Sequence, residues 1–401
     1  MVRLVLALIP IALIVSLVGT FIARALGRKL NTMDGAGVAG QVKAAPRKVP
    51  NIGGLGIFLG FALPLTALLL ALTGVQAQQN TPSIIPADLV EHLRGLASKT
   101  SSAWILLAGA FLLHIIGLID DRKPLGALPK LLIMIAVATL ATWLTDTRMF
   151  TMLDAHTGGS WASIALTVLW IVVVTNAMNF LDNMDGLSAG VGAIASMSFL
   201  AISLLQGQWF IAGCFALLAG SLLGFLAFNR PPASIFMGDG GSLVLGFLLA
   251  FLSVRITYTQ SDNGWTFYTP YSTTSGEGTG ELFAWYATLT PLVVLAIPLY
   301  DLTSVVILRL SQGKSPFVGD LQHFSHRFVE RGLSKPIAVA VIWGFAGVTG
   351  LAGILLTHTR AVGAIIIATM VALLLIVLAV IEFGGNRPTS KRTESTTGGT
   401  P

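Results

Sequence analysis

The sequence predicts an all-α, polytopic membrane protein with about eleven transmembrane helices. Of its 401 residues, 54% are hydrophobic and only 10% are charged, whereas about a quarter of the residues in a soluble domain are charged. The mean hydropathy is +0.81. Apolar runs recur from one end of the chain to the other, and each is long enough to cross roughly 30 Å of hydrocarbon. A soluble core explains neither the number nor the length of these runs.

We expect transmembrane helices at 4–23, 53–74, 102–119, 131–145, 161–180, 187–206, 208–228, 241–258, 284–308, 336–356 and 361–383. The 131–145 run is short for a helix that must cross a bilayer. Residues 1–383 therefore form one integral membrane domain. The remaining segment, 384–401, is rich in Thr, Gly and Ser and predicts a disordered cytoplasmic tail.

The Lys and Arg residues predict the orientation of the chain. With the N-terminus outside and the C-terminus inside, 18 of the 24 Lys and Arg residues fall on the inside, as the positive-inside rule requires. We expect a multi-pass protein of the bacterial cytoplasmic (inner) membrane whose basic cytoplasmic face meets anionic lipids and an anionic substrate. No basic stretch is interleaved with aromatic residues, so the sequence indicates no nucleic-acid partner.

Three acidic segments each lie at the predicted inside end of an apolar run. Their acidic residues are Asp120, Asp121, Asp182, Asp185 and Asp239. Because carboxylates repel one another, bringing five of them together requires a compensating cation. We therefore expect one metal-assisted site for a phosphorylated substrate on the cytoplasmic face.

The spacing of Asn179, Asp182 and Asp185 is i, i+3, i+6, so the three side chains share one face if the helix continues through them. Oxygen donors on one face are good ligands for a hard cation. Asp120 and Asp121 are adjacent, and two neighbouring carboxyl groups can differ in pKa enough for one to accept a proton.

The remaining polar loops supply groups suited to a phosphorylated ligand. Asp239 is framed by glycines that allow close approach of the backbone, and the next helix begins with free N–H groups. His323, His326 and Arg327 are spaced i, i+3, i+4 and share a helix face; the alternative for their loop is an amphipathic segment at the membrane surface. Lys48 adds a cation before the second apolar run.

A divalent ion suits this arrangement energetically. Two phosphates about 4 Å apart repel by roughly 4 kcal/mol at an effective dielectric constant near 20, which is equivalent to about three orders of magnitude in rate. Mg²⁺ with flanking Lys and Arg would cancel that repulsion, and Mn²⁺ is the alternative ion.

Together the motifs resemble those of the polyprenyl-phosphate N-acetylhexosamine-1-phosphate transferases (glycosyltransferase family 4). The matching stretches, in the family's order, are Val49–Gly54, Gly117–Asp121, Asn176–Leu187, Phe236–Ser242 and Pro298–His326. The resemblance covers about 45–335. It is greater to the transferases of N-acetylglucosamine (GlcNAc) 1-phosphate than to the MurNAc-pentapeptide transferases, which carry a run of three histidines that this chain lacks.

The resemblance implies an enzyme that transfers GlcNAc 1-phosphate, or a related HexNAc 1-phosphate, from a UDP-sugar to undecaprenyl phosphate and releases UMP. Its product would initiate a cell-envelope glycan such as lipopolysaccharide or a cell-wall polymer. The resemblance implies catalytic roles for Asp120, Asp121 and Asp182. It implies Mg²⁺ ligation by Asp239 and Asn179. The residues expected to bind substrate are Lys48, Lys130, Asp185, His323, His326 and Arg327.

The chain departs from the family pattern at three positions. Asn183 stands where Gly is common between the two aspartates, Ser325 replaces a histidine, and Leu321 replaces an arginine. These changes affect expected contacts to sugar or uridine. Two alternatives remain, MurNAc-pentapeptide 1-phosphate transfer and a secondary transporter, although a transporter would place its acidic residues near mid-membrane. The resemblance allows a homodimer.

Overall fold

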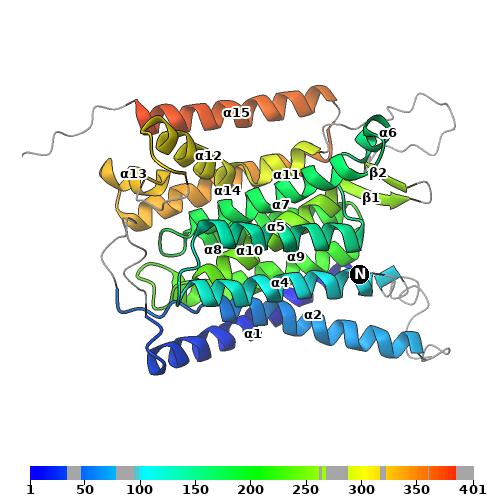
Figure 1. Cartoon of the computed structure of the whole chain (residues 1–401), viewed down its shortest axis with the longest axis horizontal. Helices are drawn as coiled ribbons and strands as arrows, with labels where there is room; N and C mark the ends of the chain where they lie inside the picture. Colours follow the sequence, from blue (N-terminus) through cyan, green and yellow to red (C-terminus); the bar gives the residue numbers. More distant parts are fainter. Residues whose placement is uncertain are drawn as a thin grey trace, which may run out of the picture.

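The computed structural model is a bundle of long helices that run side by side, with their connections at the two ends (Figure 1). It describes residues 1–33, 47–77, 95–96, 99–261, 264–267, 288–316, 322–359 and 361–384. Of the predicted tail, the structure describes only Gly384. Leu321 also lies outside the described residues.

In the described part of the chain, ten helices are long and apolar enough to cross a membrane. They are α1 (Val2–Lys29), α2 (Gly54–Ala77), α4 (Thr100–Asp120), α5 (Ala127–Thr145), α7 (Trp161–Leu181), α8 (Leu187–Leu205), α9 (Trp209–Asn229), α10 (Asp239–Thr257), α14 (Lys335–Leu356) and α15 (Ala361–Phe383). Shorter elements are η1 (Thr151–Leu153), α6 (Asp154–Thr157), α11 (Leu289–Val294), α12 (Ala296–Ser311), α13 (Phe324–Glu330) and a hairpin of β1 (Tyr258–Ser261) and β2 (Gly264–Phe267). The predicted all-α membrane fold is confirmed.

One predicted span differs from the structure. The run 284–308 is divided into α11 and α12, with Leu295 between them. Pro298 has no N–H to donate to the carbonyl of Val294, so the helical ladder is interrupted one turn before the proline. In contrast, the short run predicted at 131–145 belongs to a 19-residue helix, α5. It begins at Ala127 because Pro129 is tolerated in a first turn.

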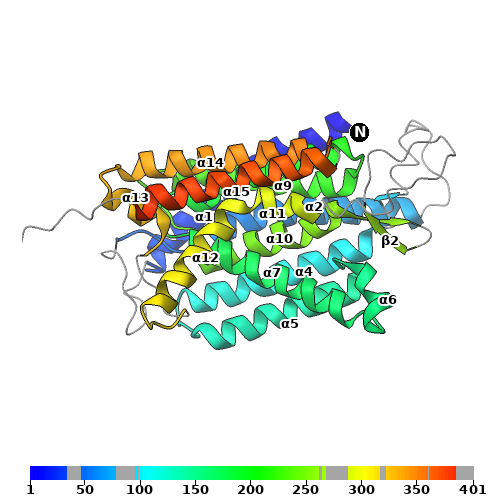
Figure 2. The same ribbon diagram turned by 90° about the horizontal axis from the view of Figure 1, so that it is seen from above.

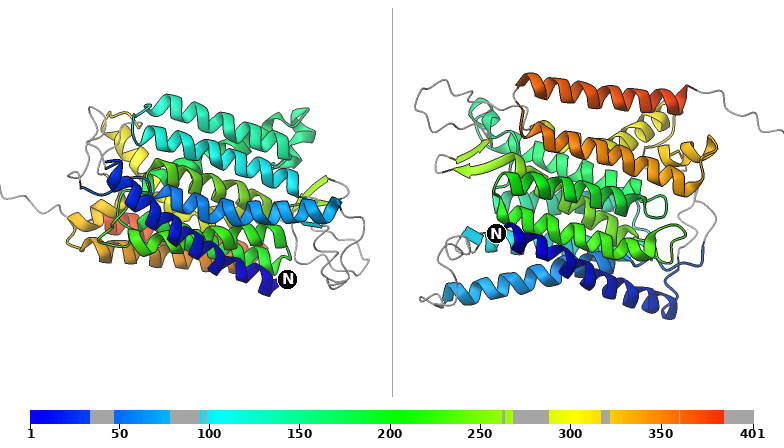
Figure 3. Two further views of the ribbon diagram at one scale, coloured as in Figure 1. Left: turned by 90° about the horizontal axis from the view of Figure 1, so that it is seen from below. Right: turned by 180° about the vertical axis from the view of Figure 1, so that it is seen from behind.

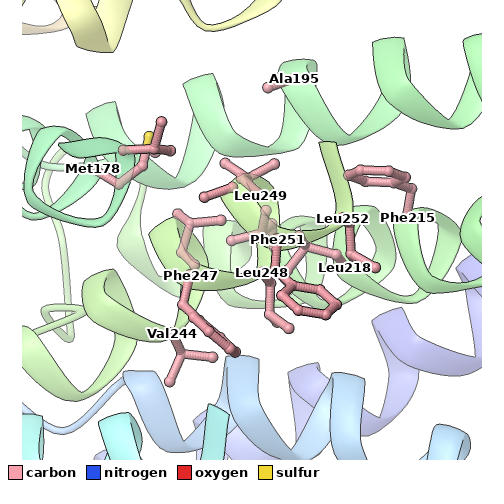
Figure 4. Close-up of a cluster of buried hydrophobic side chains, with 14 of the residues drawn as sticks. Met178, Ala195, Phe215, Leu218, Val244, Phe247, Leu248, Leu249, Phe251 and Leu252 are labelled. Carbon is pink, nitrogen blue, oxygen red and sulfur yellow. The ribbon is translucent and has the colours of Figure 1, made fainter. Parts of the chain in front are cut away.

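Helix α10 lies at the centre of the bundle and α15 at its edge (Figures 1 and 2). Every side chain from Leu243 to Leu252, glycine apart, is buried, and Figure 4 shows several of them packed against side chains of neighbouring helices. A helix that is apolar on all sides suits such a central position. α15 instead exposes Val362, Met370 and Val380, as expected for a helix that faces lipid. α1 and α2 cross at the opposite edge from α15 (Figure 3).

The ends of the helices place the predicted acidic segments together. α4 and α7 finish, and α5 and α10 begin, at the end of the bundle where α13 lies (Figure 1). The other end carries the exposed tryptophans Trp143 and Trp161, which are typical of a membrane–water interface. The prediction that the three acidic segments lie at one end of their helices, on one side of the bundle, is therefore confirmed.

Candidate active site

A glycine-rich frame brings the start of α2 against the start of α10. The Phe236 N–H donates to Pro50 O at 2.8 Å, and the N–H groups of Gly53 and Gly54 donate to Phe236 O and Met237 O at 2.8 and 2.9 Å. These bonds join the Val49–Gly54 and Phe236–Ser242 motifs, which are nearly 190 residues apart in the chain.

Two glycines make the close packing at this frame feasible. A Cβ at Gly54 would lie 2.3 Å from Gly241 N, and a Cβ at Gly117 would lie 2.3 Å from Gly240 N. Both contacts are with backbone, which cannot move aside as a flexible side chain could. The helices can therefore meet here only without side chains, which is the close approach that glycine permits.

Asp121 holds the N-terminus of α10. Its Oδ1 accepts from Asp239 N–H at 3.0 Å and from Asn51 Nδ2 at 3.0 Å, and its Oδ2 accepts from Gly240 N–H at 3.2 Å. It thereby satisfies donors that a helix start leaves without intrahelical partners. Burial and the charge of Asp239 raise the pKa of Asp121 well above its usual value. The preceding turn passes through Gly238 at φ +67°, a conformation that favours glycine.

Lys130 on α5 lies between two carboxylates from different helices. Its Nζ donates to Asp120 Oδ2 at 2.9 Å and to Asp239 Oδ2 at 2.5 Å. The other oxygen of Asp120 accepts from Leu125 N–H at 2.7 Å. One cation thus links the ends of α4, α5 and α10.

The helix does not continue through Asn179, Asp182 and Asp185, so the condition for a shared face is not met. α7 ends at Leu181, Asp182 caps it with non-helical angles, and the chain turns through Gly186 at φ +75° before α8 begins. The glycine at the end of the segment and the polar residues before it favour a turn over further helix. The three side chains consequently take different partners.

Asn179 and Asp182 remain beside Asp239. Asn179 Nδ2 donates to Asp239 Oδ1 and to Ser242 Oγ, each at 2.8 Å. Burial, together with the charges of Asp239 and Asp185, raises the pKa of Asp182 to about 8. Burial is the largest cause of this shift, and repulsion from the two neighbouring carboxylates adds to it.

Asp185 turns toward the segment before α2 and forms a bidentate ion pair with Arg47. Its Oδ2 also accepts from Ala233 N–H at 3.0 Å. Although burial favours the neutral form, the hydrogen bonds from Arg47 and Ala233 lower the pKa of Asp185. The Arg47 guanidinium also lies 4.6 Å from the centroid of the Phe236 ring. Lys48, the predicted substrate-binding residue beside it, is exposed.

The histidine segment is anchored by Asp301 on α12. Asp301 is fully buried; its Oδ2 lies 2.8 Å from His323 Nδ1, and its Oδ1 accepts from Phe324 N–H at 3.1 Å. His323 caps α13 and meets the Phe180 ring edge-on at 5.8 Å. Burial and the neighbouring His323 lower the pKa of His326 to about 4.

Arg327 takes part in a separate cluster, which we call the α13 clamp: Arg327, Glu382, Tyr300 and Ser304. The Arg327 guanidinium pairs with Glu382 and donates to Ser304 Oγ at 2.9 Å. Tyr300 donates its hydroxyl hydrogen to Glu382. Arg327, on α13, is therefore held against α12 and α15. Its predicted contact with substrate stays a prediction.

Two of the three departures from the family pattern lie against each other. Ser325 Oγ donates to Asn183 Oδ1 at 2.6 Å. The third, Leu321, lies outside the described residues.

Three residues that the structure brings in were not among the predicted site residues. Arg47 lies two residues before the Val49–Gly54 motif, Asn51 lies within it, and Asp301 belongs to the Pro298–His326 stretch. Their location in or beside the quoted motifs was an available signal. Their partners were not, because Asp185, Asp121 and His323 come from distant parts of the chain.

The carboxyl groups of the site outnumber the cations that pair with them. We call Asp120, Asp121, Asp182, Asp185 and Asp239 the acidic cluster. Lys130 and Arg47 pair with its members, which leaves an excess of carboxylates. The oxygen donors Asp239, Asn179 and Asp182 suit Mg²⁺ in kind. Within the described ranges, however, no three His, Cys, Asp or Glu residues are already placed as a metal-binding group.

Comparison with known proteins gives a consistent result. Residues 103–257 match the model of glycosyl transferase family 4. The chain is 29% identical over 89% of its length to a Bacillus subtilis protein named probable undecaprenyl-phosphate N-acetylglucosaminyl 1-phosphate transferase, covering 86% of it.

Two further relatives represent related activities. The chain is 32% identical over 80% of its length to the decaprenyl-phosphate N-acetylglucosaminephosphotransferase of Mycobacterium leprae, covering 77% of that protein. It is 31% identical over 63% of its length to the phospho-N-acetylmuramoyl-pentapeptide-transferase of Levilactobacillus brevis, covering 74% of that protein.

Proposed function

The chain belongs to glycosyl transferase family 4, and on that premise we propose that it transfers a sugar 1-phosphate from a UDP-sugar to a polyprenyl phosphate. Two of the relatives are named for transfer of an N-acetylglucosamine phosphate with a polyprenyl phosphate, and the third is named for transfer of phospho-N-acetylmuramoyl-pentapeptide. The sugar is GlcNAc and the acceptor undecaprenyl phosphate, because the GlcNAc-type relatives match 80–89% of the chain and the MurNAc-pentapeptide type 63%. MurNAc-pentapeptide 1-phosphate transfer is the second candidate.

The single observation that carries the proposal is the convergence of Asp120, Asp239 and Asn179 around Lys130. In the reaction, an oxygen of the lipid phosphate attacks the β-phosphorus of the UDP-sugar. The bond from that phosphorus to the bridging oxygen breaks, and UMP leaves with the electron pair. Phosphoryl transfer of this kind depends mainly on positioning and on neutralising the phosphates.

The contacts suggest different roles for Asp121 and Asp120. Asp121 accepts three N–H donors and is best suited to hold the start of α10 in place. Asp120 has Lys130 and Leu125 as partners and is the better candidate to receive or orient the proton of the lipid phosphate. Lys130 supplies positive charge for the phosphates.

We assign a divalent metal, Mg²⁺ with Mn²⁺ as the alternative, to Asp239 and Asn179, with Asp182 beside them. When bound, it supplies charge neutralisation for the diphosphate. The raised pKa of Asp182, which burial and the charges of Asp239 and Asp185 cause, supports a cation at this place.

The location of the site is argued from charge. With the acidic cluster on the cytoplasmic side of the inner membrane, 18 of the 24 Lys and Arg residues also lie on that side, in agreement with the positive-inside rule. The N-terminus is then outside and the C-terminus inside. Two of the exposed tryptophans, Trp143 and Trp161, mark the opposite interface.

The proposal is tested with purified protein, undecaprenyl phosphate, Mg²⁺ and either UDP-GlcNAc or UDP-MurNAc-pentapeptide. We expect UMP release and a lipid-linked product from UDP-GlcNAc, and loss of both on chelation of the metal. Product from UDP-MurNAc-pentapeptide alone would support the second candidate, and no UMP from any UDP-HexNAc would reject the function. For variants of the site, the matched control is Thr369→Val, a change on the exposed face of α15.

A further inference from the structure

Helix α13 is joined to the turn between α7 and α8 by a partly buried side-chain hydrogen bond. Ser325 Oγ donates to Asn183 Oδ1 at 2.6 Å. Ser325 is completely buried, and Asn183 follows directly after Asp182. The bond therefore connects the helix that carries His326 to the turn that carries Asp182 and Asp185.

The chemistry of the contacts determines the orientation of the Asn183 amide. Its Nδ2 donates to Phe180 O at 2.8 Å, at the end of α7. A flipped amide would place its oxygen against that carbonyl oxygen, two acceptors without a hydrogen between them. Asn183 Oδ1 is thus directed to Ser325 because its amide nitrogen is already used by the α7 terminus.

The same part of α13 is attached on its other side to α12. His323 contacts Asp301, and its ring meets Phe180 edge-on at 5.8 Å. Phe180 is also the residue whose carbonyl orients Asn183. Without the Ser325 hydrogen bond, α13 would stay attached to α12 and α15. It would lose only its attachment to the turn that carries Asp182 and Asp185.

We infer that the Asn183–Ser325 hydrogen bond is a positioning contact for the nucleotide-sugar donor. The inference rests on the proposed function and on the substrate-binding roles that the family resemblance implies for Asp185, His323 and His326. We take their substrate to be the nucleotide-sugar donor, so that both sides of this bond carry donor-binding groups. Neither residue contacts Asp120 or Lys130, which are assigned to the lipid phosphate. Weakening the bond therefore changes donor binding and leaves acceptor binding intact.

The test is a double-mutant cycle with Ser325→Ala, Asn183→Ala and both together. Each single variant should raise the KM for UDP-GlcNAc about fivefold, the effect of losing one net hydrogen bond, with kcat and the KM for undecaprenyl phosphate within twofold of wild type. The double variant should be no worse than Asn183→Ala alone, because that change already removes the bond to Ser325 together with the Asn183 bond to Phe180 O.

Ser203→Ala is the matched control, since Ser203 is also buried but donates only to Phe199 O of its own helix. It should leave both KM values unchanged. The temperature of unfolding is measured for all four variants.

Three results would overturn the inference while wild type is active: an unchanged donor KM, effects that multiply in the double variant, or a fall in kcat that tracks a lowered unfolding temperature. A wild-type protein that releases no UMP from any UDP-HexNAc would overturn the proposed function itself, and this inference with it.

Discussion

The acidic cluster and the α13 clamp lie at the same end of the bundle but differ in how their charges are balanced. In the clamp, Arg327 and Glu382 pair directly, and the remaining capacity of each is met by Ser304 and Tyr300. In the acidic cluster, five carboxyl groups share Lys130 and Arg47. In the clamp each charge has a partner of opposite sign, whereas in the acidic cluster the carboxyl groups outnumber the cations that pair with them.

This difference separates residues that stabilise the fold from residues that act on a ligand. A buried ion pair whose hydrogen bonds are satisfied mainly resists the loss of either partner. Crowded carboxylates raise one another's pKa and cost stability, a cost that proteins accept at functional sites. Variants in the two clusters should therefore affect different measurements.

The largest expected effect follows from Asp239→Asn in the acidic cluster. The change removes a proposed metal ligand and a partner of Lys130, so kcat should fall about 1,000-fold. The unfolding temperature should fall less than in a variant that leaves a buried charge unpaired, because Lys130 keeps Asp120 as a partner. UMP release and thermal unfolding measure the two effects. Asp146→Asn, at the other end of α5, is the control and should retain activity; equal loss in both variants would contradict the assignment.

Glu382→Gln should produce the opposite pattern in the α13 clamp. It leaves Arg327 buried without its anionic partner, which costs about 3 kcal/mol of unfolding free energy. Protein that remains folded should keep its kcat. The double variant Glu382→Gln with Arg327→Gln should recover part of the stability, since no uncompensated charge remains. A loss of kcat with unchanged stability would show that the clamp has a catalytic part.

Lys130→Gln tests the link between the two carboxylates of the acidic cluster. Loss of a charged hydrogen bond of about 2 kcal/mol predicts a decrease of about 30-fold in kcat/KM. Lys123→Gln is the control, because Lys123 is exposed in the loop before α5. An effect of similar size in both variants would indicate a general loss of positive charge rather than a role specific to Lys130.

The smallest effect concerns pH. Burial and His323 lower the pKa of His326 to about 4, so below about pH 6.5 the unfolded chain binds a proton there that the folded chain does not. Stability should therefore fall as the pH is lowered from 7 to 5. His326→Gln should reduce that dependence in thermal unfolding measured at both pH values. An unchanged dependence would mean that His326 titrates normally in the folded protein.

Much of the fold was predictable because crossing a membrane imposes a length and an apolar composition that can be read locally. The division of 284–308 was not foreseen, although Pro298 was its local cause. In the site, Asp120, Asp239 and Lys130 were identified by type and position. The shared face of Asn179, Asp182 and Asp185 depended on a continuous helix, and the chain instead turns at Gly186.

By itself the sequence determined that the chain is a helical membrane protein, which ends of its helices carry the charges, and which motifs contain the reactive groups. These properties depend on composition and on neighbours along the chain. The tertiary structure alone decided the partners: Asp121 on the start of α10, Asp185 on Arg47, Arg327 on Glu382 and Asn183 on Ser325. Such pairings depend on the packing of helices that are distant in sequence, and a short polar side chain can reach only what that packing places within about 3 Å of it.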